Sequence, residues 1–238
     1  GDVQVVCNGA ASSGGGGPWG GSSSENSSPE AIEAKGTITI NGGFVYAKSA
    51  DDAINAAGDL TINGGCVCAY ATNNDGIDAN GNCYIKGGLV YAIGSTSPEV
   101  AIDANTEEGK KLYISGGTVI AIGNLESGAS ITGGMAKQTT SWTAQKWYAL
   151  YNGDQLVAAF QTPAKSTSSG GGGGPGGGGP GGGGGSSQKM IVYTSSTPAL
   201  TYGVTPGGTS ILNGMVYYPA SVSGGSSVSL SNNSSNGW

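Results

Sequence analysis

A motif of three short apolar stretches and a Gly-Gly pair recurs four times along the chain, and no other feature restricts the possible folds as much. The Gly-Gly pairs begin at Gly42, Gly64, Gly87 and Gly116. One such unit is too small to bury its own apolar face, so successive units must stack on one another. The repeat therefore predicts an all-β fold, a right-handed parallel β-helix, which is a solenoid with rungs of about 22–25 residues.

The alternation of apolar and polar residues within each repeat predicts which side chains face the interior. Successive residues of a strand point to opposite faces, so every second position shares a face. The Asn-Gly-Gly that follows the second stretch supplies the positive φ of a corner, which is a structural role for these glycines. The expected core contains Ile38, Ile54, Leu60, Ile62, Val67, Ile77, Cys83, Ile85, Val90 and Ile102.

The whole chain, residues 1–238, is predicted to form one β-helix domain with two glycine-rich interruptions. Runs of glycine and proline are typical of flexible linkers. Both interruptions contain the sequence GGGGP, however, and we expect them to project from neighbouring regions of the solenoid and to pack together in extended, polyproline-like form. The predicted parts are a partial first rung (3–10), a Gly/Ser-rich loop (11–28), regular rungs (29–125), degenerate rungs (126–165), a Gly/Pro-rich loop (166–188) and C-terminal rungs or a cap (189–238).

The composition excludes several classes of function. The chain contains no His and no Arg, which excludes Ser-His-Asp and Cys-His nucleophile systems and His-ligated metals. A net charge of −6 without arginine clusters argues against a nucleic-acid partner. No apolar run is long enough to span a membrane, and the low charge with abundant Ser, Thr, Asn and Gly favours an extracytoplasmic location, either secreted or at the cell surface. The four cysteines are expected to be free thiols.

Two columns of mostly acidic residues recur from rung to rung. Neighbouring rungs of a β-helix lie about 4.7–4.9 Å apart, so the carboxylates of one column would repel each other. Calcium would relieve this repulsion, because two oxygens at about 2.3–2.6 Å on opposite sides of one ion are separated by roughly one rung. The alternative is that these are turn residues whose side chains bond backbone amides. The columns are Glu33, Asn55, Asp78 and Asp103, and Glu30, Asp52, Asp75 and, one place displaced, Glu99, with Asp75, Asp78 and Asp103 the most acidic group on adjacent rungs.

The third stretch of each repeat is expected to present apolar and aromatic residues on its outward face. Stacked aromatic rings on a flat sheet are a typical surface for sugar rings, whereas an equally apolar face can be covered by a glycine-rich loop. Both interpretations remain open at this point. The outward positions are Phe44, Cys66, Leu89 and Thr118 in one column, Tyr46, Cys68, Tyr91 and Ile120 in the next, and Lys48 and Tyr70 further along the same face.

The repeated pattern I-x-G-G-x-V-x-A with D-G-I-x-A, here INGGCVCA and DGIDA, resembles a bacterial family of right-handed parallel β-helix carbohydrate-binding domains. The resemblance covers residues 3–125, and LVAAFQTP and MIVYTSSTPALTYG resemble the C-terminal part of that family. It implies a pectate-lyase-like fold without catalysis, in a secreted or surface protein that binds acidic plant polysaccharide or cellulose with calcium between rungs. Among the outward residues, Tyr46, Tyr91, Phe44, Tyr70 and Lys48 would then contact the sugar.

Two other classes of function stay open beside binding. A lyase of this fold class usually abstracts the proton with Arg, and only Lys is present here. An inverting hydrolase needs two carboxyl groups about 6.5–9.5 Å apart, which the acidic columns offer geometrically. A structural or adhesive surface protein without a sugar ligand is the third class. The sequence favours non-catalytic, calcium-dependent polysaccharide binding and leaves the oligomeric state open.

Overall fold

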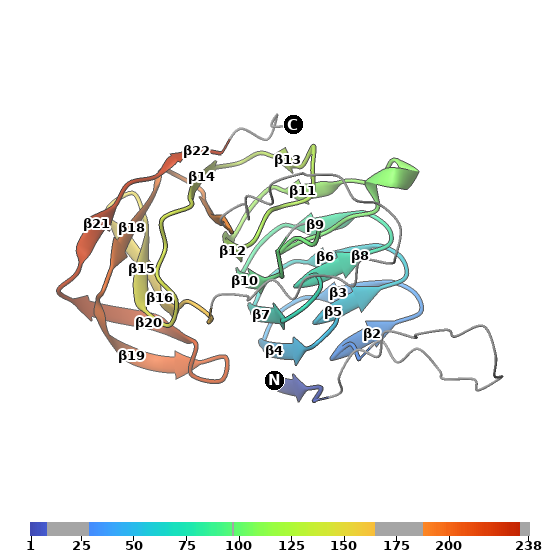
Figure 1. Cartoon of the computed structure of the whole chain (residues 1–238), viewed down its shortest axis with the longest axis horizontal. Helices are drawn as coiled ribbons and strands as arrows, with labels where there is room; N and C mark the ends of the chain where they lie inside the picture. Colours follow the sequence, from blue (N-terminus) through green and yellow to red (C-terminus); the bar gives the residue numbers. More distant parts are fainter. Residues whose placement is uncertain (9–28, 97, 165–187, 234–238) are drawn as a thin grey trace, which may run out of the picture.

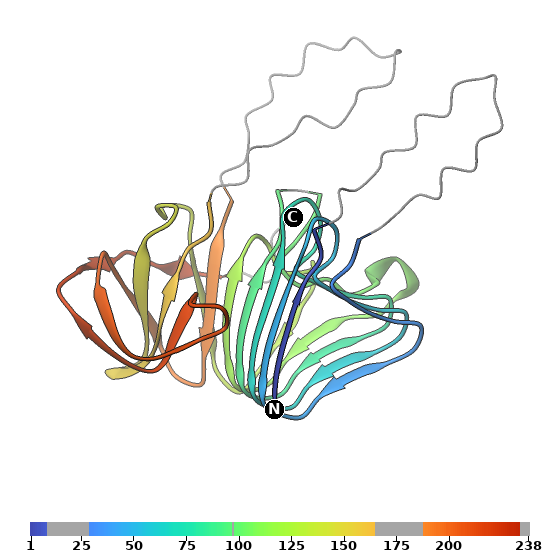
Figure 2. The ribbon, with the colours of Figure 1, turned by 90° about the horizontal axis from the view of Figure 1, so that it is seen from below.

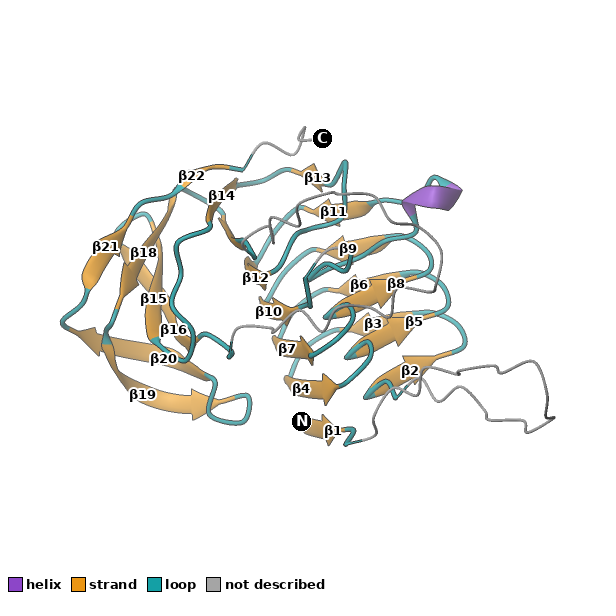
Figure 3. Ribbon diagram, in the orientation of Figure 1, coloured by secondary structure: helices purple, strands orange, loops and turns teal. Residues whose placement is uncertain are grey.

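The computed structural model of this 238-residue chain describes residues 1–8, 29–96, 98–164 and 188–233. Within these ranges the fold is all-β apart from one short 3₁₀ turn, Thr106–Glu108 (Figure 3). The loop at 11–28, and the loop at 166–188 except for Gln188, lie outside the described residues, and so does their expected packing against each other.

Short parallel strands stack into three sheets and give the N-terminal half of the fold a β-helix-like architecture (Figure 1). The first sheet contains β2 (Ile32–Ala34), β5 (Ile54–Ala56) and β8 (Ile77–Ala79). The second contains β3 (Ile38–Ile40), β6 (Leu60–Ile62), β9 (Cys83–Ile85), β11 (Leu112–Ile114) and β13 (Ser130–Ile131). The third begins with β1 (Asp2–Val6), β4 (Phe44–Ser49), β7 (Cys66–Ala71), β10 (Leu89–Ile93) and β12 (Thr118–Ile122).

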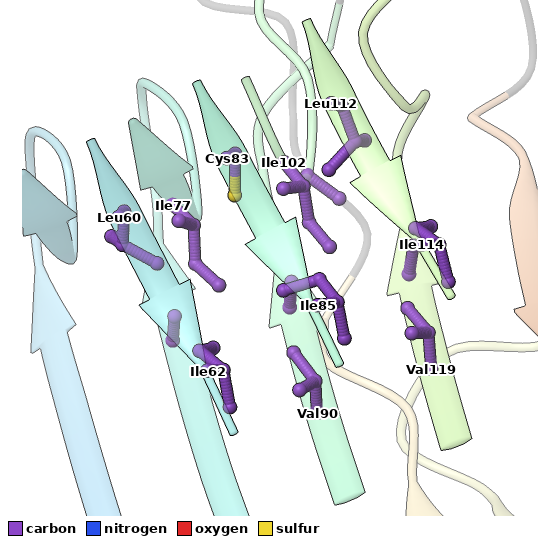
Figure 4. Packing of buried hydrophobic residues seen from close by; sticks show 14 of the residues in the cluster. Leu60, Ile62, Ile77, Cys83, Ile85, Val90, Ile102, Leu112, Ile114 and Val119 are labelled. Atoms are coloured by element: carbon purple, nitrogen blue, oxygen red, sulfur yellow. The ribbon is translucent and has the colours of Figure 1, made fainter. Parts of the chain in front are cut away.

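The register of these strands confirms the predicted alignment of the repeats. Ile54 pairs with Ile32 on one side and Ile77 on the other, and Ile102 continues the column. Equivalent residues therefore stack directly above one another and form columns of interlocking aliphatic side chains (Figure 4). Every predicted core residue is fully buried except Ile38, which is partly buried because it belongs to the first complete rung.

The corner glycines are required by both conformation and packing. The second glycine of each pair has a positive φ, for example 82° at Gly88. A Cβ on Gly88 would lie 2.5 Å from the backbone oxygen of Gly65 in the preceding rung. Beside the corners, Asn63 Nδ2 donates a hydrogen bond of 2.8 Å to Asn41 Oδ1, so the corner asparagines also stack.

The repeat pattern ends after the fourth rung because an antiparallel strand enters the third sheet. β13 still pairs in parallel with β11, so a weak fifth rung begins. The strand β17 (Met190–Thr194) then lies between β12 and β14 (Met135–Thr139) and is antiparallel to both. With β22 (Ser231–Asn232) beyond β14, these strands cap the eight-stranded sheet and cover an edge that would otherwise expose unpaired backbone groups.

A fourth sheet, which is antiparallel, replaces the rungs predicted for much of 126–165 and 189–238. Its six strands lie in the order β19-β20-β16-β15-β18-β21. The hairpin at Asn152 and Gly153 folds β16 back on β15, which rules out a parallel rung there. The strands are β15 (Trp147–Asn152), β16 (Gln155–Gln161), β18 (Pro198–Tyr202), β19 (Thr205–Ile211), β20 (Val216–Ser223) and β21 (Ser226–Val228).

The antiparallel sheet packs on the outward face of the eight-stranded sheet. In Figure 2 it forms a separate layer beside the stacked parallel strands. Tyr148, Leu150, Phe160 and Leu200 of this layer share a buried cluster with Tyr91 and other outward residues of the parallel strands. The fold therefore has two cores, one inside the stacked rungs and one between the two layers.

Candidate functional site

The outward face of the third sheet, which the antiparallel sheet covers, contains two of the residues predicted to bind sugar. We call it the covered face. Tyr46 and Tyr91 are only 2% and 0% exposed, because the antiparallel sheet packs over them. The Tyr91 ring packs edge-on against Phe160 with centroids 5.5 Å apart, and its hydroxyl donates a 2.8 Å hydrogen bond to the backbone oxygen of Gln161. The structure thus corrects the interpretation of these two tyrosines as a sugar platform. They belong to the interior, and the described cover is a β-sheet rather than a glycine-rich loop.

The other three predicted sugar contacts lie towards the N-terminal end of the same sheet. Phe44 is 39% exposed, while Lys48 and Tyr70 are half-buried. The ammonium group of Lys48 lies over the Tyr70 ring, 4.8 Å from its centroid. One face of that ring is therefore occupied by a cation, and burial raises the pKa of the Tyr70 hydroxyl. Of the five predicted residues, Phe44 has the most accessible ring.

The predicted metal ligands form a ladder of side chains along the first sheet, which we call the acidic ladder (Asp52, Asn55, Asp75, Asp78 and Asp103). Asn55 Nδ2 joins two rungs by donating to Asp52 Oδ2 at 3.1 Å and to Asp78 Oδ2 at 2.9 Å. Asp52 Oδ1 accepts the backbone N–H of Asp75 at 3.0 Å, and Asp75 Oδ1 in turn accepts that of Val100 at 2.5 Å. These bonds are the turn contacts expected of such residues, so the ladder aligns successive rungs.

Burial makes the acidic ladder costly to ionise. Desolvation, with the neighbouring carboxylates adding to it, raises the pKa of Asp52 to about 7 and that of Asp75 to about 8. Desolvation and the bond to Glu126 raise the pKa of Asp103 to about 9. The pKa of Asp78 is raised by desolvation as well. At neutral pH the ladder therefore holds protons that free aspartates would lose.

Glu126 extends the ladder beyond the residues that the sequence pattern singled out. Burial opposes its ionisation, but hydrogen bonds from Asp103, Ser127 and Thr106 lower its pKa. The Ser127 backbone N–H lies 2.7 Å from Glu126 Oε1. Leu125 pairs with Ile102, which places Glu126 in the same column as Asp103. The signal in the sequence was the apolar-acidic pair Leu125-Glu126 at the position where a fifth repeat would begin.

The remaining predicted ligands lie around this ladder. Glu33 aligns with Asn55 in the register, but its carboxylate is paired with Lys35. Glu30 is close enough to raise the pKa of Asp78, and burial raises the pKa of Glu99. In the described part of the chain, no three acidic, Cys or His side chains are arranged to hold a metal ion as they stand. Carboxylate and amide oxygens are ligands that calcium prefers, but in this arrangement the oxygens of the ladder accept hydrogen bonds from neighbouring residues.

A pair of outward tyrosines on the second sheet was not among the residues predicted from the sequence to form a site. Tyr84 of β9 and Tyr113 of β11 are register partners, and their rings stack with centroids 5.1 Å apart and planes 9° apart. Lys86 places its ammonium group 5.1 Å from the Tyr84 centroid. The signal was present in the repeats, since both tyrosines are the central residue of the second stretch, as CYI and LYI.

The fold and these surfaces define a repeat-built, all-β protein with stacked parallel strands and outward faces of distinct chemistry. A family model described as "Carbohydrate-binding domain-containing protein" matches residues 1–76, from β1 to the end of the second rung. Comparisons with curated proteins and with solved structures give no match. In the ranges that the structure describes, no helix is long and apolar enough to cross a membrane.

Proposed function

We propose that this protein binds polysaccharide outside the cell without cleaving it, and that its ligands are acidic chains of the plant cell wall. The observation that carries the proposal is the match of residues 1–76 to a carbohydrate-binding family model. We infer in addition that the stacked rungs form a right-handed parallel β-helix, because crossovers between parallel strands are almost always right-handed. The fourfold repeat and its parallel register support this inference.

Non-catalytic binding agrees with the residues that the chain offers. Arg and His are absent from the sequence, so a general base would have to be a lysine, a carboxyl group, a tyrosine or a cysteine. Incubation with polygalacturonate, with retention of the protein on the immobilised polymer and new chain ends both measured, tests the proposal. We expect retention without new reducing ends or unsaturated products. Cleavage at a rate that depends on the protein would contradict it.

Calcium is the second part of the proposal. Asp52, Asp78 and Asp103 lie on adjacent rungs and carry the carboxylate oxygens that calcium prefers. These residues would hold the ion after losing their protons and exchanging the hydrogen bonds through Asn55 for metal contacts. The buried, protonated ladder supports the proposal, because a cation would replace the protons that now offset the repulsion.

The melting temperature should reveal competition between protons and calcium. The ladder pKa values lie above the ordinary value near 4, so the folded state binds more protons than the unfolded state between that pH and about 9. Without divalent cations, stability should be highest near pH 4 and fall as the pH rises through 7 to 9. At pH 8, calcium should raise the melting temperature and so reverse most of this loss of stability. A chelator should lower the melting temperature again.

A matched pair of variants locates the effect. Asp78→Asn keeps the size of the side chain but removes a carboxylate from the centre of the ladder, so it should weaken the calcium response. Glu107→Gln removes an acid from the exposed 3₁₀ turn and should leave the response unchanged. A wild-type melting temperature that is the same with calcium and with chelator at pH 8 would overturn the calcium proposal.

A further inference from the structure

We propose that the polysaccharide lies on the outward face of the second sheet, where the Tyr113 ring stacks on a pyranose ring and Lys86 and Lys111 contact uronate carboxylates. This inference rests on the proposed function and assigns it a place and residues. The face is built by the residues of β9 and β11 that do not enter the core. Neither the acidic ladder nor the covered face of the third sheet takes part in it.

Strand alternation fixes the direction of these side chains. Cys83, Ile85, Leu112 and Ile114 are fully buried in the rung core, so the residues between and beside them point outward. Tyr113 is 37% exposed although its ring is stacked on Tyr84. The tyrosine pair is thus a rigid aromatic surface supported by two adjacent rungs.

One ring face of the pair is open to a ligand. Tyr84 is stacked on Tyr113, and the ammonium group of Lys86 also lies over the Tyr84 ring, 5.1 Å from its centroid. The next residue in the column beyond Tyr113 is Ser130 of β13. A serine side chain is too short to cover an aromatic ring. The Tyr113 face above Ser130 is therefore available, and an aromatic face of this kind packs well against the C–H groups of a sugar ring.

The charges around the pair favour an acidic sugar. Lys86 follows Tyr84 by two positions and Lys111 precedes Tyr113 by two, so both exposed lysines share the outward face with the tyrosines. Neither ammonium group has a carboxylate partner in the described part of the chain. The nearby carboxylate of Asp59 accepts the backbone N–H of Asn82 at 2.8 Å. Two lysines beside the aromatic pair outnumber the one nearby carboxylate, that of Asp59, so this surface carries a small excess of positive charge in a chain of net charge −6.

The rest of the face offers hydrogen-bonding groups in register. Thr39 and Thr61 precede Tyr84 in the same column of outward residues. The stacked Asn41 and Asn63 stand in the next column. Hydroxyl and amide groups at rung intervals can donate to and accept from the hydroxyls of successive sugars. An extended chain lying across the rungs would meet the threonines first and the tyrosine pair last.

Calorimetric titration of the full chain with a galacturonate oligomer tests the site, and a neutral glucose oligomer serves as the second ligand. Tyr113→Ala should weaken binding about tenfold, while Tyr113→Phe keeps it, because stacking needs the ring and not the hydroxyl. The double variant Lys86→Gln/Lys111→Gln should weaken binding of the galacturonate oligomer and reduce its salt dependence. Tyr218→Ala, which removes an exposed tyrosine of the antiparallel sheet, is the matched control and should bind like the wild type.

The outcomes separate this inference from the proposed function. If the wild type binds galacturonate and both Tyr113→Ala and the double lysine variant bind it equally well, the proposed site is wrong and the proposed function stands. Binding of the neutral oligomer alone would overturn the choice of an acidic ligand. A wild type that binds neither oligomer nor their polymers would overturn the function together with the site. Since all substituted side chains are at least partly exposed, unchanged melting temperatures should show that each variant folds.

Discussion

Replacing Ile77 by alanine is expected to lower the free energy of unfolding by about 2–5 kcal/mol. Ile77 is fully buried, and its register partners Ile54 and Ile102 belong to the adjacent rungs. Backbone hydrogen bonds between rungs hold these neighbours in place, so the structure cannot relax into the space that the side chain leaves. A cavity therefore remains, and its cost adds to the lost transfer free energy of the removed methyl and methylene groups.

Denaturant unfolding of the wild type and the variant measures this loss. Thr39→Ala is the control, because Thr39 is an exposed residue on the outward face of a rung strand, and it should change stability by less than about 0.5 kcal/mol. A loss below about 1 kcal/mol for Ile77→Ala would mean that the column is not a tightly packed core.

Replacing Gly88 by alanine is expected to destabilise the protein by about 2–4 kcal/mol. The φ of 82° at this corner is unfavourable for any residue with a Cβ. The new Cβ would also lie 2.5 Å from the Gly65 oxygen and 2.8 Å from the Gly64 carbonyl carbon. Because both contacts are backbone atoms of the preceding rung, relief requires the rungs to move apart.

Gly109→Ala separates the cost of the positive φ from the cost of the contacts with the preceding rung. Gly109 has a similar φ of 75° at the end of the 3₁₀ turn, but no atom lies within 4 Å of the added Cβ. Its substitution should cost only the backbone strain, about 1–2 kcal/mol. Equal losses in the two variants, measured by denaturant unfolding, would show that close stacking of the rungs does not constrain the corner.

The rungs could be predicted from the sequence because the same pattern occurs in four successive repeats. The alternation around Ile54, Leu60 and Val67 places one face inward, and three further copies remove the ambiguity of a single short strand. The positive φ of Gly88 also followed from the repeat. These features depend on contacts between equivalent residues, and equivalent residues can be aligned without knowing the structure.

The second layer could not be predicted in the same way. Apolar and polar residues alternate around Trp147–Asn152 as in any half-buried strand, and this pattern does not indicate which sheet the strand packs against. Tyr46 and Tyr91 therefore looked like an exposed aromatic column, although Phe160 and its neighbours bury them. Tyr84 and Tyr113 could not be recognised as a site in the same way, because their column begins with Thr39 and Thr61 and is aromatic only in two of its rungs. Which outward column stays open depends on a non-repeating part of the chain.

The acidic ladder shows a third kind of limit. The pattern predicted correctly that Asn55 and Asp78 stand on adjacent rungs. It did not predict that the Asn55 amide would bridge two carboxyl groups, because that depends on side-chain rotation. Stacking of the acids follows from the repeat, whereas the choice between protons and a cation as the compensating charge depends on the surrounding solution.

The most direct test of polysaccharide binding is a calorimetric titration of the purified full chain with polygalacturonate at pH 7 in calcium. We expect saturable binding, with polymer of unchanged length recovered afterwards. We also expect weaker binding after chelation, because calcium held by the acidic ladder would stabilise the rungs that carry the binding face. Absence of saturable binding by a protein that is shown to be folded would contradict the account.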